Sequence, residues 1–173
     1  MREQSLRINF KMVKEISNQT DIINQTNNVG APVISNLQQQ ISGNNITSDF
    51  SYRPERNVEV GFVIKVGRSQ DNFPSTPTII NLNSQTLRLN LSFANTGRLR
   101  IEFKRDELRA NITTNFIPFE LTSGNVIGKN YYWQFNFDYR LAANLQSTIS
   151  YDGRALGNEK TVHTARAEVR AYF

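Results

Sequence analysis

The stretch V-H-T-A-R-A-E-V-R-A-Y-F, which runs from Val162 to Phe173, decides the fold that this sequence predicts. Apolar side chains occupy every second position from Ala165 to Phe173, and polar or charged side chains lie between them as far as Arg170. Side chains alternate between the two faces of a strand, so the stretch predicts one apolar and one charged face. A soluble sheet would pack the apolar face against a core. A membrane barrel would turn it to lipid and keep the charges in its lumen.

The same alternation recurs through most of the chain and predicts seven further strands. These lie at residues 4–14, 45–52, 58–68, 84–94, 98–104, 130–141 and 145–151. Strands of roughly 8 to 12 residues are long enough to cross a bilayer at a tilt. We therefore expect an all-β fold, an antiparallel up-and-down transmembrane β-barrel of about eight strands, which is either complete or a segment of a larger barrel.

The connections between the predicted strands alternate in length. Residues 1–173 are expected to form a single barrel domain, or barrel segment, with long loops at about 15–44, 70–83, 105–129 and 152–160. Within the first loop, the spacing of Ile34, Leu37 and Ile41 would suit a short helix. Short turns are expected near Pro54, Thr96 and Ala143. Outer-membrane barrels have short periplasmic turns and longer outer loops, so the short-turn side, where Phe173 ends, is predicted to face the periplasm.

The terminal strand resembles the assembly signal of Gram-negative outer-membrane β-barrels, through its last residue Phe173 and the residues Val169 and Ala171 that alternate before it. The chain as a whole resembles the C-terminal portion of large, mostly uncharacterised proteins of this kind. The resemblance implies a location in the cell outer membrane, contact with outer-membrane lipid and insertion by the barrel-assembly machinery. It implies no substrate.

Aromatic side chains are expected at both edges of the apolar face. Tyr131 and Trp133 would enter the membrane at the outer rim, while Tyr139 and Tyr52 would lie at the periplasmic rim with Phe173. Such rings favour a membrane interface because one end of the ring is apolar and the other is wet. These residues are the predicted aromatic girdle.

The opposite faces of the same strands carry charges of both signs, which are predicted to line the lumen. The predicted lumen charges are Arg88, Arg100, Glu102, Lys104, Asp138, Arg140, Arg166, Glu168 and Arg170. Opposite charges on neighbouring strands can pair across the ladder. So many ionic groups could not be buried in a dry core without a heavy desolvation cost, whereas a wet lumen or bulk water accommodates them.

The composition fits a barrel with a polar interior. Hydrophobic residues make up 38% of the 173 residues, and the mean hydropathy is −0.49, which is low for a soluble globular domain. The absence of cysteine excludes disulfides and thiolate metal sites. The net charge of +5 could suit an anionic partner, but the basic residues are interspersed with acids, so we expect no nucleic-acid partner.

The sequence offers no support for catalysis or for a cofactor. His163 is the only histidine, and no phosphate-binding loop or hydrolase motif appears. The neighbouring carboxylates Asp106 and Glu107 are expected to be solvated in a loop. We therefore predict no catalytic residues, no cofactor site and no metal site, and we expect that the protein is not an enzyme.

Two alternatives stay open. A soluble, lipocalin-like barrel would turn the apolar faces inward around a small ligand, and a surface-exposed β-structured adhesin segment would use the long loops. The first residues, Met1 to Gln4, lead into a strand without an apolar signal-peptide region, although a barrel must be exported. We therefore expect the chain to be the C-terminal part of a longer precursor.

Overall fold

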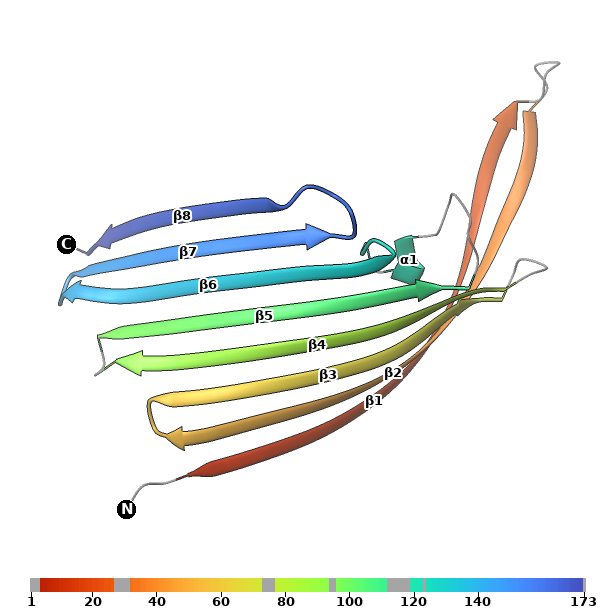
Figure 1. Cartoon of the computed structure of the whole chain (residues 1–173). Helices are drawn as coiled ribbons and strands as arrows, with labels where there is room; N and C mark the ends of the chain where they lie inside the picture. Colours follow the sequence, from red (N-terminus) through yellow and green to blue (C-terminus); the bar gives the residue numbers. More distant parts are fainter. Residues whose placement is uncertain are drawn as a thin grey trace.

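Eight antiparallel strands form one sheet in a computed structural model that describes residues 4–26, 32–72, 77–93, 96–111, 119–122 and 124–172. Each strand pairs with its neighbours in the sequence, so the order is β1 to β8 (Figure 1). The strands are β1 (Ser5–Thr26), β2 (Pro32–Glu55), β3 (Val58–Asp71), β4 (Thr78–Phe93), β5 (Gly97–Ala110), β6 (Gly128–Ala142), β7 (Leu145–Leu156) and β8 (Val162–Ala171). The predicted all-β, up-and-down fold is confirmed.

One short helix, α1 (Phe119–Thr122), interrupts the connection between β5 and β6. It has a single turn of four residues. Within the described ranges, no helix has the length and hydrophobicity that crossing a bilayer requires.

The register aligns the apolar positions of all the strands in continuous rows on one face. One row, for example, runs from Phe62 on β3 through Leu87 and Phe103 to Trp133 on β6. Because the side-chain period of a strand is two, a slip by one residue would turn an entire strand over. The in-phase alternation of every strand therefore specifies one register, with one apolar and one polar face.

The strands are longer than the alternation predicted, and the loops are correspondingly shorter. Most of the predicted loop 15–44 belongs to β1 and β2, whose pairing continues to Thr26 and Pro32, far beyond the last pair between β2 and β3. The suggested helix around Leu37 is therefore also wrong, because this segment is part of β2. The backbone ladder needs only N–H and C=O groups, so strands can pair where the side chains do not alternate.

The predicted alternation of short and long connections holds along the sheet. Residues 56–57, 94–96 and 143–144 join strands at one end, which we call the turn end, where β1 also begins and β8 ends (Figure 1). Residues 27–31, 72–77, 111–127 and 157–161 join strands at the other end, which we call the loop end. Beyond the main sheet, β1 and β2 project from the loop end as a two-stranded ribbon.

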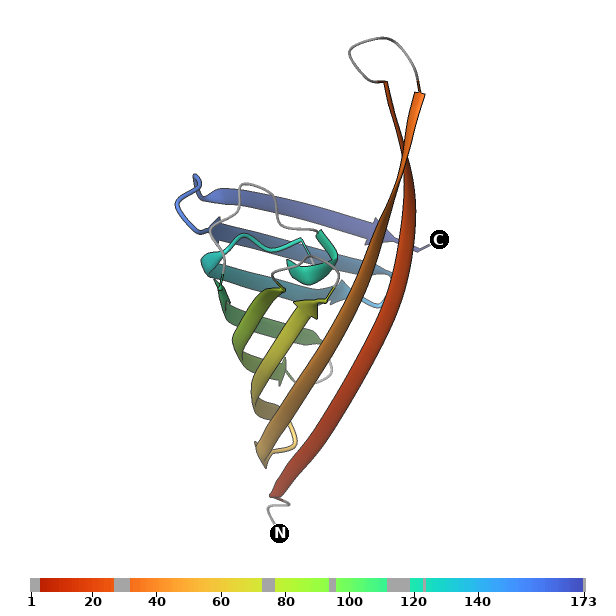
Figure 2. The ribbon, with the colours of Figure 1, turned by 90° about the vertical axis from the view of Figure 1, so that its right-hand side faces the viewer.

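The sheet is strongly curved, and α1 lies in its hollow (Figure 2). The hollow side is the polar face, because α1 packs on Ile80 and Leu108, which are in phase with the charged positions of β4 and β5. With Leu121 of α1, these two are the only buried hydrophobic side chains in the described part of the chain. The sheet does not close on itself, since the described residues of β1 and β8 form no pair with each other.

Candidate functional site on the concave face

The predicted lumen charges all lie on the concave face. The register places Arg88 opposite Glu102, in a row that continues through Gln134 to Asp152. The next row toward the turn end runs from Arg100 on β5 to Arg166 on β8. The remaining predicted lumen charges share this face, namely Lys104, Asp138, Arg140, Glu168 and Arg170. The structure therefore places both signs of charge together along one polar wall.

One ion pair crosses an entire strand of this wall. The Arg88 guanidinium on β4 donates a hydrogen bond to the Asp49 carboxylate on β2, with Nη2 to Oδ1 at 2.7 Å. The strand between them, β3, carries Gly61 opposite Arg88. A Cβ at Gly61 would lie 3.2 Å from Arg88 Nε. Because Gly61 has no side chain, the space above it stays open, and Arg88 extends through this space to Asp49.

One further ion pair on this face, between Arg53 on β2 and Glu59 on β3, joins neighbouring strands as predicted. The remaining ion pairs on this face differ from that prediction. Lys104 pairs with Asp106, and Arg170 pairs with Glu168, each at 2.7 Å and each two residues apart along one strand. Residues two apart lie on the same face, so long basic side chains can fold back along their own strand. These contacts steady individual side chains but do not tie strands together.

The connection between β5 and β6 is anchored against the concave wall near the loop end. Leu121 of α1 packs on Ile80 and Leu108. Two hydrogen bonds hold the residues between α1 and β6. The Tyr132 hydroxyl donates to Asn125 Oδ1 at 2.6 Å, and Asn130 Nδ2 donates to the Val126 carbonyl at 2.7 Å. The segment 119–127 therefore narrows the hollow at this end.

Asp106 lies beneath this segment. It belongs to β5 and is 1% exposed, so the expectation of a solvated loop carboxylate was wrong for this residue. Lys104 Nζ lies 2.7 Å from Asp106 Oδ2 and sits over the ring of Tyr132, 5.2 Å from its centre. The alternation could have revealed the buried position, because Asp106 continues the phase of Glu102 and Lys104.

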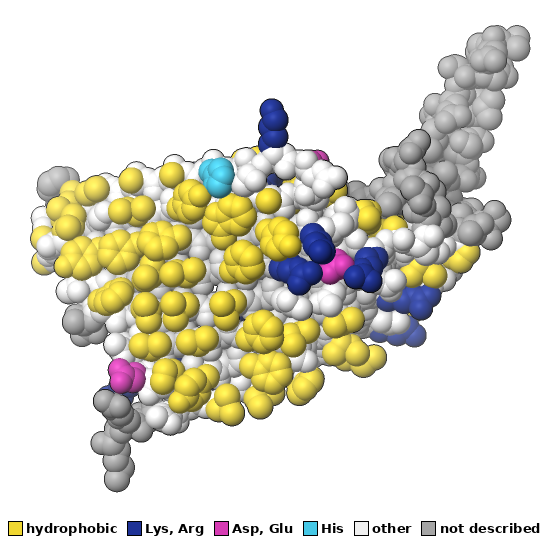
Figure 3. Space-filling model, viewed as in Figure 1, with side chains coloured by type: hydrophobic (Ala, Val, Ile, Leu, Met, Phe, Trp, Pro, Cys, Tyr) yellow, Lys and Arg dark blue, Asp and Glu magenta, His cyan; other side chains and the backbone are white. Residues whose placement is uncertain are grey.

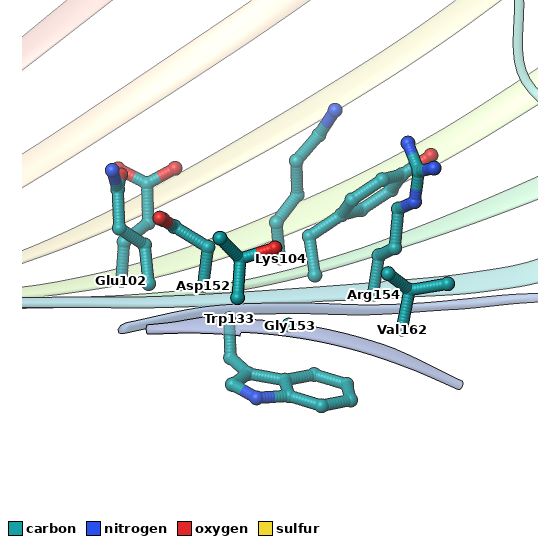
Figure 4. Close-up of a pocket in the computed structure, with 10 residues that line it drawn as sticks. Glu102, Lys104, Trp133, Asp152, Gly153, Arg154 and Val162 are labelled. Carbon is teal, nitrogen blue, oxygen red and sulfur yellow. The ribbon is translucent and has the colours of Figure 1, made fainter. Parts of the chain in front are cut away.

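A hollow of about 440 Å³ follows the concave face of β5 to β8. Glu102, Lys104, Asp152 and Arg154 project into it, whereas Trp133 points to the opposite side of the sheet (Figure 4). Carboxylates and cations lie side by side on its walls. Such charged groups can bind water, ions or polar solutes. In the described parts of the chain, no three His, Asp or Glu side chains gather in a way that could hold a metal ion.

The convex face is an exposed apolar band (Figure 3). Phe10 on β1 is 76% exposed, and Val169 on β8 is 63% exposed. The band also includes Leu6, Ile8, Met12, Val60, Phe62, Leu87, Ile101, Phe103 and Ile149, all of which are exposed. Contiguous exposed apolar surface of this kind is typical of a face that contacts a membrane or another protein.

The predicted girdle residues lie on this convex face. Tyr131 and Trp133 lie toward the loop end, in the rows of Arg105 and Phe103, and Tyr139 lies toward the turn end, opposite Gly97. Tyr52 lies near the same end of β2. Tyr131 and Tyr139 are eight residues apart, or about 27 Å along the strand and about 20 Å at a 40° tilt, which is close to the apolar height of a membrane barrel.

Of the predicted assembly residues, Val169 and Ala171 lie on the convex face of β8 at the turn end, opposite Ser147 and Leu145. Phe173 lies outside the described residues. β8 is an edge strand, and its described side chains are all exposed. Their assembly role stays a prediction.

Comparisons with known proteins show a shared fold. No protein family model matches the sequence, and no curated protein matches it. Among solved structures, the chain is similar to the outer-membrane expressed OmpT of Vibrio cholerae, with a TM-score of 0.54 and 11% sequence identity. The match covers 99% of this chain and 57% of that chain. The two chains therefore share a fold, and this chain spans little more than half the length of the protein that it resembles.

The prediction that the protein is not an enzyme was wrong, because this fold does not exclude an enzymatic activity. The structural neighbour is an outer-membrane protein, and a likeness at 11% identity shows the fold alone. One fold carries many functions, so this barrel fold is compatible with an enzymatic activity and gives no ground for denying one.

Proposed function

We propose that this chain forms part of the wall of an outer-membrane β-barrel, with its concave face lining a water-filled passage. The barrel would have a structural, transport or secretion role. The observation that carries the proposal is the division of the sheet into an exposed apolar convex face and a charged concave face. Hydrocarbon solvates the first and water solvates the second. With only three buried hydrophobic side chains in its described part, the sheet has too small a core to be held together in water by its interior.

The lipocalin-like alternative requires the reverse arrangement. Such a barrel would hold its ligand between inward apolar side chains, but here Leu87, Ile101 and Phe103 are exposed on the convex side. The hollow side presents Glu102, Lys104 and the other charges. This polarity supports a membrane wall and disfavours an apolar ligand cavity.

The proposal extends to the surroundings of the protein. The chain would be the C-terminal portion of a larger Gram-negative outer-membrane protein, with lipid around its convex face. The barrel-assembly machinery would recognise the terminal strand through Val169, Ala171 and Phe173. The short turns at the turn end would face the periplasm, and the β1–β2 ribbon at the loop end would face outward.

The two faces can be tested by chemical labelling, because the chain has no cysteine of its own. Gln134 faces the hollow and its neighbour Phe135 lies on the convex face, so Gln134→Cys and Phe135→Cys are a matched pair. In lipid vesicles, a charged thiol reagent is expected to modify Gln134→Cys rapidly and to leave Phe135→Cys unmodified. Equal labelling of both variants, or recovery of the unmodified protein as a soluble monomer without detergent, would contradict the proposal.

A further inference from the structure

The convex face changes character where the strands continue past the apolar band toward the loop end. There the register forms a row from Lys14 on β1 through Asn44, Arg68 and Asn81 to Arg109 on β5. The adjacent row on the membrane side begins with Met12, Ile46 and Val66. On β1 to β3, one step of two residues, about 7 Å, therefore separates apolar side chains from a line of cations and amides. On β4 and β5 the adjacent row continues through Asn83 to Glu107.

A groove of about 660 Å³ lies over this boundary. Its apolar side is formed by Met12, Ile46 and Val66, and its polar side includes Lys14, Arg68 and Arg109. The groove is therefore amphipathic. Its apolar half lies on the membrane side, where the acyl chains of a lipid would be, and its polar half lies where the head group would be. A small soluble anion would use only the polar half.

The charge of this region is strongly positive. Glu107 is the one carboxylate on the described convex face here, and it accepts hydrogen bonds from Arg105 at 3.1 Å and from Arg109 at 2.6 Å. Glu107 shares its row with Met12, Ile46 and Val66, and its side chain lines the groove. Five cations lie in this row and the rows on either side of it, namely Lys14, Arg68, Arg105, Arg109 and Lys129.

We infer that this groove binds the phosphate-bearing head group of an anionic membrane lipid, whose acyl chains lie against Met12, Ile46 and Val66. The inference rests on the proposed function, because it requires the convex face to be in a bilayer. Guanidinium groups bind phosphate oxygens in paired hydrogen bonds, and Lys14 adds a mobile point charge. Asn44 and Asn81, between the cations in the row, supply further amide donors.

The test uses the protein refolded in detergent and offered phosphatidylglycerol or phosphatidylcholine, with retained lipid counted by native mass spectrometry. The triple variant Lys14→Gln, Arg68→Gln, Arg109→Gln is expected to lose preference for phosphatidylglycerol by about tenfold or more. The matched control Arg98→Gln, Arg100→Gln, Arg166→Gln removes three cations from the concave face and should keep the preference. Equal loss in both triples would mean a general charge effect and would overturn the inference.

A substitution of opposite sign sharpens the test. Glu107→Gln removes the carboxylate that Arg105 and Arg109 share, so it should increase retention of phosphatidylglycerol. Unchanged or weaker retention would contradict the inference, as would displacement of the lipid by millimolar inorganic phosphate, which would indicate a site for soluble anions. The labelling of Gln134→Cys and Phe135→Cys separates failure of this inference from failure of the proposed function. If the two variants label as expected but the protein with Lys14, Arg68 and Arg109 intact shows no preference for phosphatidylglycerol, only the lipid site is rejected. In the triple variant, the same labelling pattern would show that its lost preference is not caused by failure to insert.

Discussion

At the residue scale, the concave wall depends on where a side chain is missing. Arg88 reaches Asp49 across β3 because Gly61 offers no side chain in its path. The side chains of Arg88 and Asp49 are 37% and 32% exposed, so the pair contributes on the order of 1 kcal/mol or less. Its effect is mainly to hold an arginine flat against the wall, where it would otherwise extend into the hollow.

We predict that Gly61→Val separates Arg88 from Asp49, because a branched side chain fills the path between them. The free energy of unfolding should fall by about 1 kcal/mol, which combines loss of the pair with steric displacement. Urea-induced unfolding of the protein in lipid vesicles, followed through the fluorescence of the single tryptophan, Trp133, measures the change.

Gly43→Val is the control for this prediction. Gly43 lies on the concave face, as Gly61 does, but on β2. A Cβ at Gly43 would meet only Ser69 Oγ, at 3.7 Å, which is an ordinary van der Waals distance. The control should be neutral or slightly stabilising, since valine suits a strand better than glycine. In an Arg88→Met background, Gly61→Val should lose most of its effect, and an undiminished effect would refute the proposed path.

At the element scale, the segment 119–127 differs from the other described connections because it turns into the hollow. Leu121 is 4% exposed and packs on Ile80 and Leu108, and Tyr132 and Asn130 hold the residues after α1 by hydrogen bonds. A single helical turn has no stability of its own, so these contacts determine its position. If the hollow is a water-filled passage, this segment limits its width.

We therefore predict that Leu121→Ala releases the segment from the wall. The lost packing is worth about 2 to 3 kcal/mol locally. Amide hydrogen exchange in residues 119–127 should accelerate by about tenfold or more, while exchange in β5 and β6 stays slow. In a planar bilayer, the same variant should raise ion conductance.

Leu141→Ala is a suitable control, because Leu141 is 54% exposed at the turn end, far along β6 from α1. It should alter neither the exchange rates nor the conductance. If Leu121→Ala leaves exchange in 119–127 unchanged, the hydrophobic anchor is not what holds the segment.

At the scale of the whole molecule, the open sheet leaves two edges, β1 and β8. In hydrocarbon an unpaired backbone N–H or C=O group costs several kcal/mol, so lipid-exposed sheet edges do not persist in a membrane. The strands β1 and β8 lie at opposite edges of the sheet and do not pair in its described residues (Figure 1). Both edges must therefore pair with something else when the sheet is in a bilayer.

We predict that the closed wall contains more than these eight strands, from the rest of a longer polypeptide or from a second copy. Cysteine pairs that combine Asn9→Cys on β1 with Arg166→Cys, Glu168→Cys or Arg170→Cys on β8 sample neighbouring registers of a direct β1–β8 contact. In vesicles, none should form an internal disulfide, as judged by gel mobility. Efficient internal cross-linking in one register would show that eight strands close by themselves.

Much of the fold could be predicted because alternation is a local property. The phase of Leu99, Ile101 and Phe103 against Arg100, Glu102 and Lys104 fixes which side chains share a face, whatever the partner strand. The same phase, followed further, places Asp106 on the concave side and Arg105, Glu107 and Arg109 on the convex side. The prediction stopped at Lys104 because the apolar positions stop there, although the strand continues to Ala110.

The sequence by itself determined the eight-stranded order, the two contrasting faces and the alternation of short and long connections, because each follows from the backbone period or from local turn residues. Only the tertiary structure decided the inward position of Leu121, the crossing of Arg88 to Asp49 over Gly61, and the basic row from Lys14 to Arg109. These features join residues from different strands. Their proximity depends on register and curvature, which the whole sheet sets together and no single segment contains.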